Sequence, residues 1–187
     1  NAELRNLLKE YHDGLLLYEE SDQKVWKKAT QDDEGLTKFF KKNKKMYAWS
    51  APRFKGAIIM GKSQAVVDKV AKAMENCTSK EEVEKVRKQF PPILQKQFYV
   101  RFGLYKEGDE KYVDAEMFGK AKPQSHKHFP YYKVVGKMLK NPQVYTDEKA
   151  KVIADYQNQQ EQTWVKALRK KYAYSIDKSV LATVNKH

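Results

Sequence analysis

The chain has 187 residues, of which 41% are hydrophobic and 33% are charged, and its formal net charge is +13. This length and composition are typical of a globular protein with one large domain or two small ones. No apolar run approaches the roughly 18 residues of a membrane-spanning helix, and a single cysteine, Cys77, excludes an intrachain disulfide.

The first part of the chain, up to about residue 47, is predicted to be helical. Ser21 or Asp22 can cap a second helix, and the acidic run 32–34 is typical of the start of a third. The stretch from Trp49 to Pro52 ends this region, because the residue before a proline disfavours the helical conformation. The first helix should carry an apolar stripe at helical spacing, formed by Leu4, Leu7, Leu8, Tyr11, Leu15 and Tyr18.

The middle of the chain, residues 49–140, is predicted to combine strands and helices. We expect a strand at Arg53–Met60, an amphipathic helix at 63–74, and a second helix that begins at Thr78 or Ser79. The Pro91-Pro92 pair ends that second helix.

Apolar residues stand at every second position over residues 97–105, and this alternation predicts a strand with two different faces. A turn at 107–109 and a further apolar run predict that residues 112–118 return as its antiparallel partner, followed by a last strand at 131–135. The face expected in the core consists of Phe98, Val100, Phe102 and Leu104.

One long helix dominates the last part, residues 141–187. Thr146 or Asp147 can cap it, and beyond Tyr172 the pattern changes to a short predicted strand at 173–176 and an apolar run at 179–184. The stripe of the long helix consists of Ile153, Tyr156, Gln160, Trp164 and Leu168. The whole order predicts an α+β fold, in which an antiparallel sheet is flanked by helices and the terminal segments 1–48 and 141–187 pack on each other.

Several motifs resemble one protein family. Asp155-Tyr156-Gln157 and the run from Trp164 to Tyr172 resemble the C-terminal end of SurA-like periplasmic foldases, of the parvulin (PpiC-type) family of peptidyl-prolyl cis–trans isomerases. Residues 10–22 and the Val25-Trp26 pair resemble the helical start of these foldases, and residues 50–140 look like their parvulin-type domain. The resemblance covers most of the chain.

The resemblance implies a parvulin-like sheet domain at 49–140, inserted between the two helical segments of a chaperone module. It also implies a periplasmic protein that binds unfolded envelope or outer-membrane protein segments rich in aromatic residues, without a cofactor or a metal. Because the chain begins with Asn1 and carries no signal peptide, we expect a fragment of a longer protein whose targeting signal lay upstream.

The chain departs from the family at the catalytic positions. A working parvulin begins with a strand of the form Arg-Ala-Ser-His-Ile-Leu, whose His belongs to the active site, and here Gly56 stands at that position. The later Gly-Tyr-His motif has no counterpart. We therefore expect no catalytic residue and a client-binding module without catalysis in this fragment. An active prolyl isomerase is the alternative, and an upstream domain could supply that activity to the full protein.

Aromatic residues supply the candidate peptide-binding site. Tyr99, Arg101 and Tyr105 share the second face of the 97–105 strand, where they could offer ring surface to an extended peptide. Phe54 and Trp49 belong to the same predicted set. The alternative is that this face underlies a helix.

Two further features are expected to be structural. His126 and His128 have a spacing that suits a shared metal ion, but further ligands lie far off in sequence, so we expect a solvated loop and no metal. Cys77 lies at a predicted helix end, without a nearby His that would activate its thiol.

The positive charge raises the alternative of nucleic-acid binding. The lysines, however, are spread along every segment and interleaved with acids, as in 80–85. The densest basic run, 41–45, suits the C-terminal end of a helix. Since no RNA-binding fingerprint or zinc finger is present, we expect no nucleic-acid partner.

Overall fold

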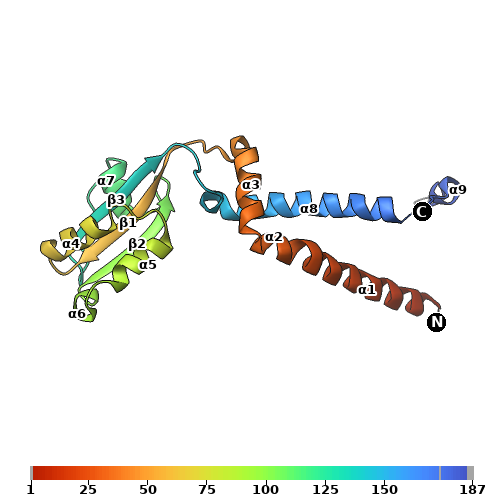
Figure 1. Ribbon diagram of the computed structural model, residues 1–187, viewed down its shortest axis with the longest axis horizontal. Helices are drawn as coiled ribbons and strands as arrows, with labels where there is room; N and C mark the ends of the chain where they lie inside the picture. Colours follow the sequence, from red (N-terminus) through yellow and green to blue (C-terminus); the bar gives the residue numbers. More distant parts are fainter. Residues whose placement is uncertain (1, 173, 185–187) are drawn as a thin grey trace. The chain divides into compact units, whose positions relative to one another are not determined.

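The computed structural model describes residues 2–172 and 174–184, and the chain forms two compact units. Unit 1 combines residues 1–43 with 144–187, and unit 2 comprises residues 44–143. The fold is α+β as predicted, with a three-stranded antiparallel sheet accompanied by helices (Figure 1). Within the described ranges, no helix combines the length and the apolar character that crossing a bilayer requires.

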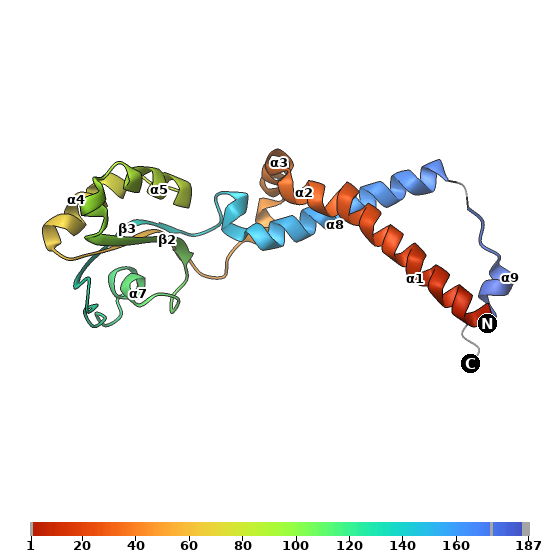
Figure 2. The same cartoon turned by 90° about the horizontal axis from the view of Figure 1, so that it is seen from below.

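Unit 1 is built from helices contributed by both ends of the chain. The N-terminal part runs through α1 (Ala2–Ser21), a π-helical segment (Asp22–Trp26), α2 (Lys27–Gln31) and α3 (Asp33–Asn43). The C-terminal part contains a 3-10 turn (Tyr145–Glu148), α8 (Lys149–Lys171) and the short α9 (Lys178–Leu181). Beyond the point where α8 meets α2 and α3, α1 and α8 run apart (Figure 2).

The core of unit 1 lies where α8 packs on α2 and α3. The rings of Phe39 and Tyr156 lie 5.4 Å apart between centroids, and the side-chain amide of Gln157 donates to the carbonyl of Trp26 at 3.2 Å. The buried hydrophobic side chains among the described residues of unit 1 are Val25, Ala29, Leu36, Phe39, Phe40, Val152 and Tyr156. The predicted contact between the two terminal helical segments is therefore confirmed.

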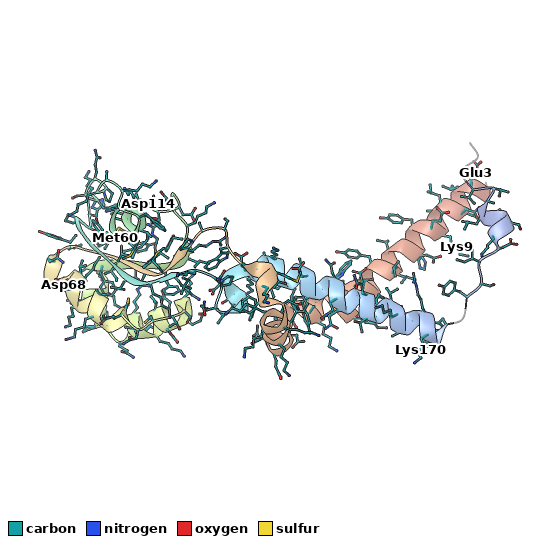
Figure 3. All side chains as sticks on the ribbon, turned by 90° about the horizontal axis from the view of Figure 1, so that it is seen from above. Glu3, Lys9, Met60, Asp68, Asp114 and Lys170 are labelled. Atoms are coloured by element: carbon teal, nitrogen blue, oxygen red, sulfur yellow. The ribbon has the colours of Figure 1, made fainter. Side chains whose placement is uncertain are left out.

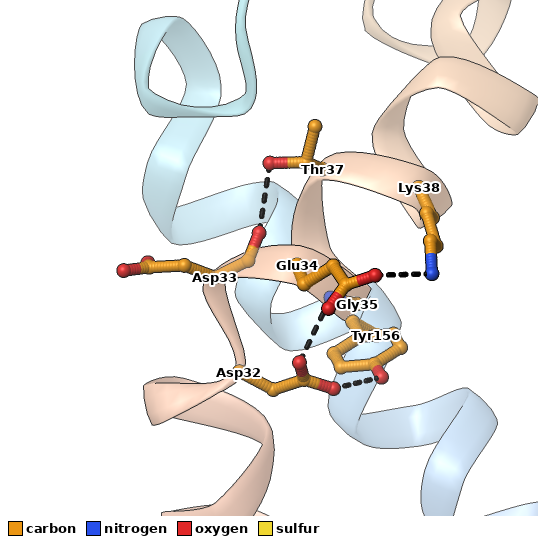
Figure 4. A network of polar contacts seen from close by, with 7 residues as sticks. All are labelled: Asp32, Asp33, Glu34, Gly35, Thr37, Lys38 and Tyr156. Carbon is orange, nitrogen blue, oxygen red and sulfur yellow. Dashed lines mark hydrogen bonds and ion pairs between the residues drawn. The ribbon is translucent and has the colours of Figure 1, made fainter.

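A polar junction at Asp32 joins α2, α3 and α8 (Figure 4). The Asp32 carboxylate accepts hydrogen bonds from the backbone N–H of Gly35 at 2.8 Å and from the hydroxyl of Tyr156 at 2.7 Å. The Tyr156 bond and then the Gly35 bond hold the pKa of Asp32 below its ordinary value. Asp32 thus caps the start of α3 and ties it to the C-terminal helix.

Asp32→Asn is expected to remove a pH-dependent part of the stability of unit 1. The lowered folded-state pKa means that the ionised carboxylate stabilises the fold fully above about pH 5, and that this contribution is lost as the pH falls through that pKa. At neutral pH the variant should lose about 1–2 kcal/mol of unfolding free energy. From neutral pH to about pH 3, the wild type should lose stability more steeply than the variant.

Urea unfolding followed by Trp26 and Trp164 fluorescence, in a Trp49→Phe background, measures this effect in unit 1. Glu34→Gln is the matched control, because Glu34 is exposed and its ion pair with Lys38 (2.5 Å) joins neighbouring turns of α3 only. Equal pH slopes for wild type and Asp32→Asn would contradict the assigned role.

Unit 2 contains the sheet, whose strand order is β2-β1-β3 with both pairings antiparallel. The central strand β1 (Arg53–Gly61) lies between β2 (Phe98–Tyr105) and β3 (Tyr131–Leu139).

Helices cover both faces of the sheet. One face is covered by α4 (Gln64–Met74), α5 (Lys80–Lys88) and α6 (Pro92–Gln95), and the other by α7 (Lys111–Met117) (Figures 1 and 2). A 3-10 turn (Lys44–Tyr47) precedes β1. Because β1 is covered on both faces, its apolar run 57–60 is continuous rather than alternating.

Two apolar clusters fill the two sides of the sheet. The first joins Ala57 and Ile59 of β1 to α4 and α5. Of the predicted core residues, Phe98 is buried in this cluster, and Val100 and Phe102 are partly buried against it. The second, on the α7 side, consists of the buried residues Phe54, Ile58, Met60, Tyr112 and Val113. Ser63 and Ser79 cap α4 and α5 by accepting backbone N–H bonds from Val66 and Glu82, as expected for these positions.

The strand predicted at 112–118 is wrong, because this segment forms α7. Tyr112 and Val113 are buried, and Met117 and Phe118, four or five residues later, pack against the same cluster. This spacing is that of a helix. The true partner of β2 is β1, which places β2 at a sheet edge.

The end of the chain also differs from the prediction. Residue 173 of the predicted strand 173–176 lies outside the described residues, and 174–176 form no strand. In the apolar run 179–184, only the first residues are helical, as part of α9.

Candidate peptide-binding surface

The candidate surface is the α7 side of the sheet in unit 2, here named the aromatic face. Its floor is the buried cluster around Ile58 and Met60. Figure 3 labels Met60 on β1 and Asp114 on the helix that covers this side. The partly buried residues packed against the floor are Tyr105, Met117, Phe118, Phe129, Tyr132 and Val134.

Tyr99 is the most exposed of the predicted site residues on this face. Its side chain is 46% exposed, and in the sheet register it lies opposite Met60, which in turn lies opposite Tyr132 of β3. The Tyr132 hydroxyl donates to Glu116 at 2.9 Å, and its ring lies 4.8 Å from that of Tyr112. Burial, and then the bond to Glu116, raise the pKa of Tyr132 to about 12. The Tyr132 ring is therefore held in place by α7, whereas Tyr99 offers accessible ring surface.

Arg101 and Tyr105 attach α7 to the edge strand. The Arg101 guanidinium forms an ion pair with Glu110, the residue immediately before α7. Tyr105 lies over Gly103, since a Cβ added to that glycine would be 2.7 Å from the ring Cζ. Burial raises the pKa of Tyr105. Both residues are half-buried. The start of α7 therefore covers part of this end of the aromatic face, and the rest of it is accessible to a ligand.

Phe54 and Trp49 are not exposed partners of Tyr99. Phe54 has no exposed surface (0%) and belongs to the floor, so its ring is inaccessible to a peptide. Trp49 is half-buried, and the guanidinium carbon of Arg53 lies 4.5 Å from its ring centroid. In the register Phe54 lies opposite Tyr105, whereas Met60 lies opposite Tyr99. The predicted residues therefore spread along about 20 Å of strand rather than meeting at one point.

A row of glycines crosses the sheet at the position where the resemblance places a catalytic histidine. Gly56 lies opposite Gly103 on one side and Gly136 on the other. A Cβ on Gly56 would lie 2.6 Å from the ring Cζ of Phe54 and 2.8 Å from the Cα of Gly136. Gly136 itself has a φ of +150°, which favours glycine. The backbone carbonyl oxygen of Val135, which is the atom nearest to a Cβ on Gly56, and the Phe54 ring thus occupy the space that a side chain at position 56 would need.

The other candidate groups take structural positions. Cys77 is half-buried against the first cluster, and burial raises the pKa of its thiol, which disfavours the reactive thiolate. His126 accepts backbone N–H bonds from His128 (3.2 Å) and Phe129 (3.3 Å) through Nδ1, so that nitrogen shapes the loop. The described residues contain no cluster of three or more His, Cys, Asp or Glu that could hold a metal.

Tyr132, Phe118 and Phe129 belong to the aromatic face but were absent from the predicted set. Tyr132 could have been found from the alternation of its strand, which sets it and Val134 on one side. Phe118 belongs to the segment predicted as a strand, whereas in the structure it directly follows α7. Phe129 lies in a segment without helical or strand periodicity, so the sequence pattern predicts no position for its side chain.

No protein-family model matches this chain, and neither a curated protein nor a solved structure shows significant similarity to it. The resemblance to SurA-like foldases therefore stays a prediction, and the functional argument depends on the geometry of the aromatic face.

Proposed function

We propose that the chain is a client-binding module of a chaperone, and that its aromatic face binds extended polypeptide segments without catalysis. The observation that carries this proposal is the exposed ring of Tyr99 on an edge strand, on the same side of the sheet as the half-buried rings of Tyr105 and Tyr132. Rings on a pleated surface suit alternate side chains of an extended peptide. We propose aromatic-rich unfolded envelope or outer-membrane proteins in the periplasm as the clients, as the resemblance implies.

The order of elements in unit 2 supports the proposed parvulin-like domain. A strand, helices and further antiparallel strands follow one another between two helical segments that contact each other. Lys111 beside the aromatic face, together with the excess of lysine and arginine over the whole chain, supports clients that carry acidic residues. The Lys111 ammonium lies 5.1 Å from the centre of the Tyr112 ring, and the whole chain has a net charge of +13.

Tyr99→Ala is expected to weaken peptide binding without destabilising unit 2. Loss of one exposed ring contact should lower affinity about fivefold, the effect of roughly 1 kcal/mol. The probe is a fluorescein-labelled peptide of alternating aromatic and polar residues, and the measurement is its fluorescence anisotropy during titration with the chain. A second assay follows aggregation of a urea-unfolded outer-membrane β-barrel protein after dilution.

Tyr131→Ala is the matched control for this experiment. Tyr131 is 44% exposed, much as Tyr99 is, but it lies opposite Gly61 and therefore on the other side of the sheet. Peptide affinity should be unchanged in the control. Equal losses in both variants, or no loss in either, would reject the aromatic face as the binding surface.

A further inference from the structure

The stripe along α1 is an exposed apolar surface in unit 1, separate from the aromatic face. The residues predicted to form the apolar stripe of the first helix do lie on one side of α1, but their side chains are 52–67% exposed. The α1 stripe is defined here as Leu4, Leu8, Tyr11, Leu15 and Tyr18, which alternate at spacings of four and three. Among the described residues, Tyr18 meets the ring of Trp26 edge-on at 5.5 Å, while α8 packs on the segments that follow α1. Figure 3 shows α1, labelled at Glu3 and Lys9, standing apart from the end of α8 near Lys170.

An unpartnered stripe with this spacing is typical of a helix that pairs with another helix. The stripe extends over about 20 Å. A contiguous row of large apolar side chains of this length is more than a monomeric surface usually leaves exposed. The charges beside the stripe indicate which partner it fits.

Arg5 and Glu19 lie on the same flank of the stripe, two heptads apart. If a second copy of α1 runs antiparallel, with Leu8 opposite Tyr18 and Tyr11 opposite Leu15, the Arg5 of each copy comes beside the Glu19 of the other. The two-fold symmetry forms this ion pair twice. In a parallel pairing, the flank with Arg5 and Glu19 faces Leu7 and Gly14 of the other copy, so no ion pair forms between them.

Gly14 lies on the other flank, close to the symmetry axis of the antiparallel arrangement. A Cβ added to Gly14 would meet nothing within 4 Å in the chain itself. Glycine weakens a helix interior relative to alanine, and among the described residues no neighbour of Gly14 calls for a glycine at this position. A small residue there lets the backbone of a second helix approach closely.

We propose that two copies of the chain associate through an antiparallel pairing of their α1 stripes. This inference does not depend on the proposed function, because it concerns unit 1 and is tested by association alone. The pairing buries the exposed parts of the stripe side chains from both copies, and the flanking charges select its direction.

Sedimentation velocity of the full chain over the micromolar range tests the proposal, with a reversible monomer–dimer equilibrium as the expected result. Leu15→Glu should abolish the dimer. Leu16→Glu is the matched control, because these neighbouring leucines are 52% and 53% exposed but Leu16 lies off the stripe. Circular dichroism should show equal helix content in the two variants.

Charge reversal tests the direction of pairing. Arg5→Glu and Glu19→Arg should each weaken self-association about tenfold, because each converts two attractive pairs into two repulsive ones. An equimolar mixture of the two variants should dimerise at least as well as the wild type, since both pairs re-form in the mixed dimer. The proposal is overturned by a chain that stays monomeric, by equal effects of the two leucine variants, or by a mixture no better than its components.

Discussion

Gly56→His is expected to unfold unit 2 rather than to create a catalytic side chain. A Cβ at this position would overlap the backbone carbonyl oxygen of Val135 and would approach the Phe54 ring at 2.6 Å and the Gly136 Cα at 2.8 Å. No rotamer relieves this overlap, because it begins at the first side-chain atom. Gly56 lies on the central strand, so displacement of β3 or of Phe54 disrupts the sheet or its buried cluster. We expect a loss of about 3 kcal/mol or more in unfolding free energy.

Urea unfolding measures this loss through the fluorescence of Trp49, the tryptophan of unit 2, in a Trp26→Phe/Trp164→Phe background. Lys137→His is the matched control, because it places the same side chain next to Gly136 at an exposed edge position and should change stability by less than about 0.5 kcal/mol.

A protease-coupled assay with a proline tetrapeptide accompanies the measurement of stability. Neither the wild-type chain nor the Gly56→His variant should accelerate isomerisation. Acceleration by the wild type would favour the alternative of an active prolyl isomerase. A folded and active variant would show that position 56 has room for the histidine after all.

Phe54→Ala is expected to destabilise unit 2 by about 3–5 kcal/mol, the usual range for a buried phenylalanine. The ring is fully buried and lies against both Gly56 and Gly136, so its removal leaves a cavity beside two residues that have no side chain to fill it. Phe54→Leu keeps much of the volume and should lose less than about 1.5 kcal/mol. The measurement is the same fluorescence-detected unfolding.

The comparison with Tyr99→Ala separates packing from recognition. Phe54→Ala should lower stability strongly, whereas Tyr99→Ala should lower peptide affinity and leave stability within about 1 kcal/mol. If Phe54→Ala kept its stability and lost peptide binding, Phe54 would have the contact role that the sequence predicted for it.

The two proposed surfaces belong to different units and should be separable by mutation. Tyr99→Ala changes the edge of the sheet and should leave self-association intact, whereas Leu15→Glu changes α1 and should leave binding at the aromatic face intact. Together the two variants would tell whether client binding and dimerisation compete.

The sequence determined most of the helices and the faces of the strands. The stripe of α1, the acidic start of α3 and the spacing along α8 correspond to helices in the structure. Alternation in β2 correctly placed Phe98 in the core and Val100 and Phe102 against it, whereas the fourth predicted core residue, Leu104, is only half-buried. These features follow from local geometry, because side-chain direction repeats every 3.6 residues in a helix and every two residues in a strand.

Only the tertiary structure decided which of these faces are covered. Tyr112 to Met117 are helical because the floor around Ile58 and Met60 requires a cover, although the sequence of this segment is equally compatible with a strand. Phe54 is buried and Tyr99 is exposed, yet both are aromatic residues on the same side of neighbouring strands. The apolar stripe of α1 would suit a buried helix, but its side chains are 52–67% exposed. Periodicity shows which residues lie side by side; contact with a segment distant in the sequence determines whether water reaches them.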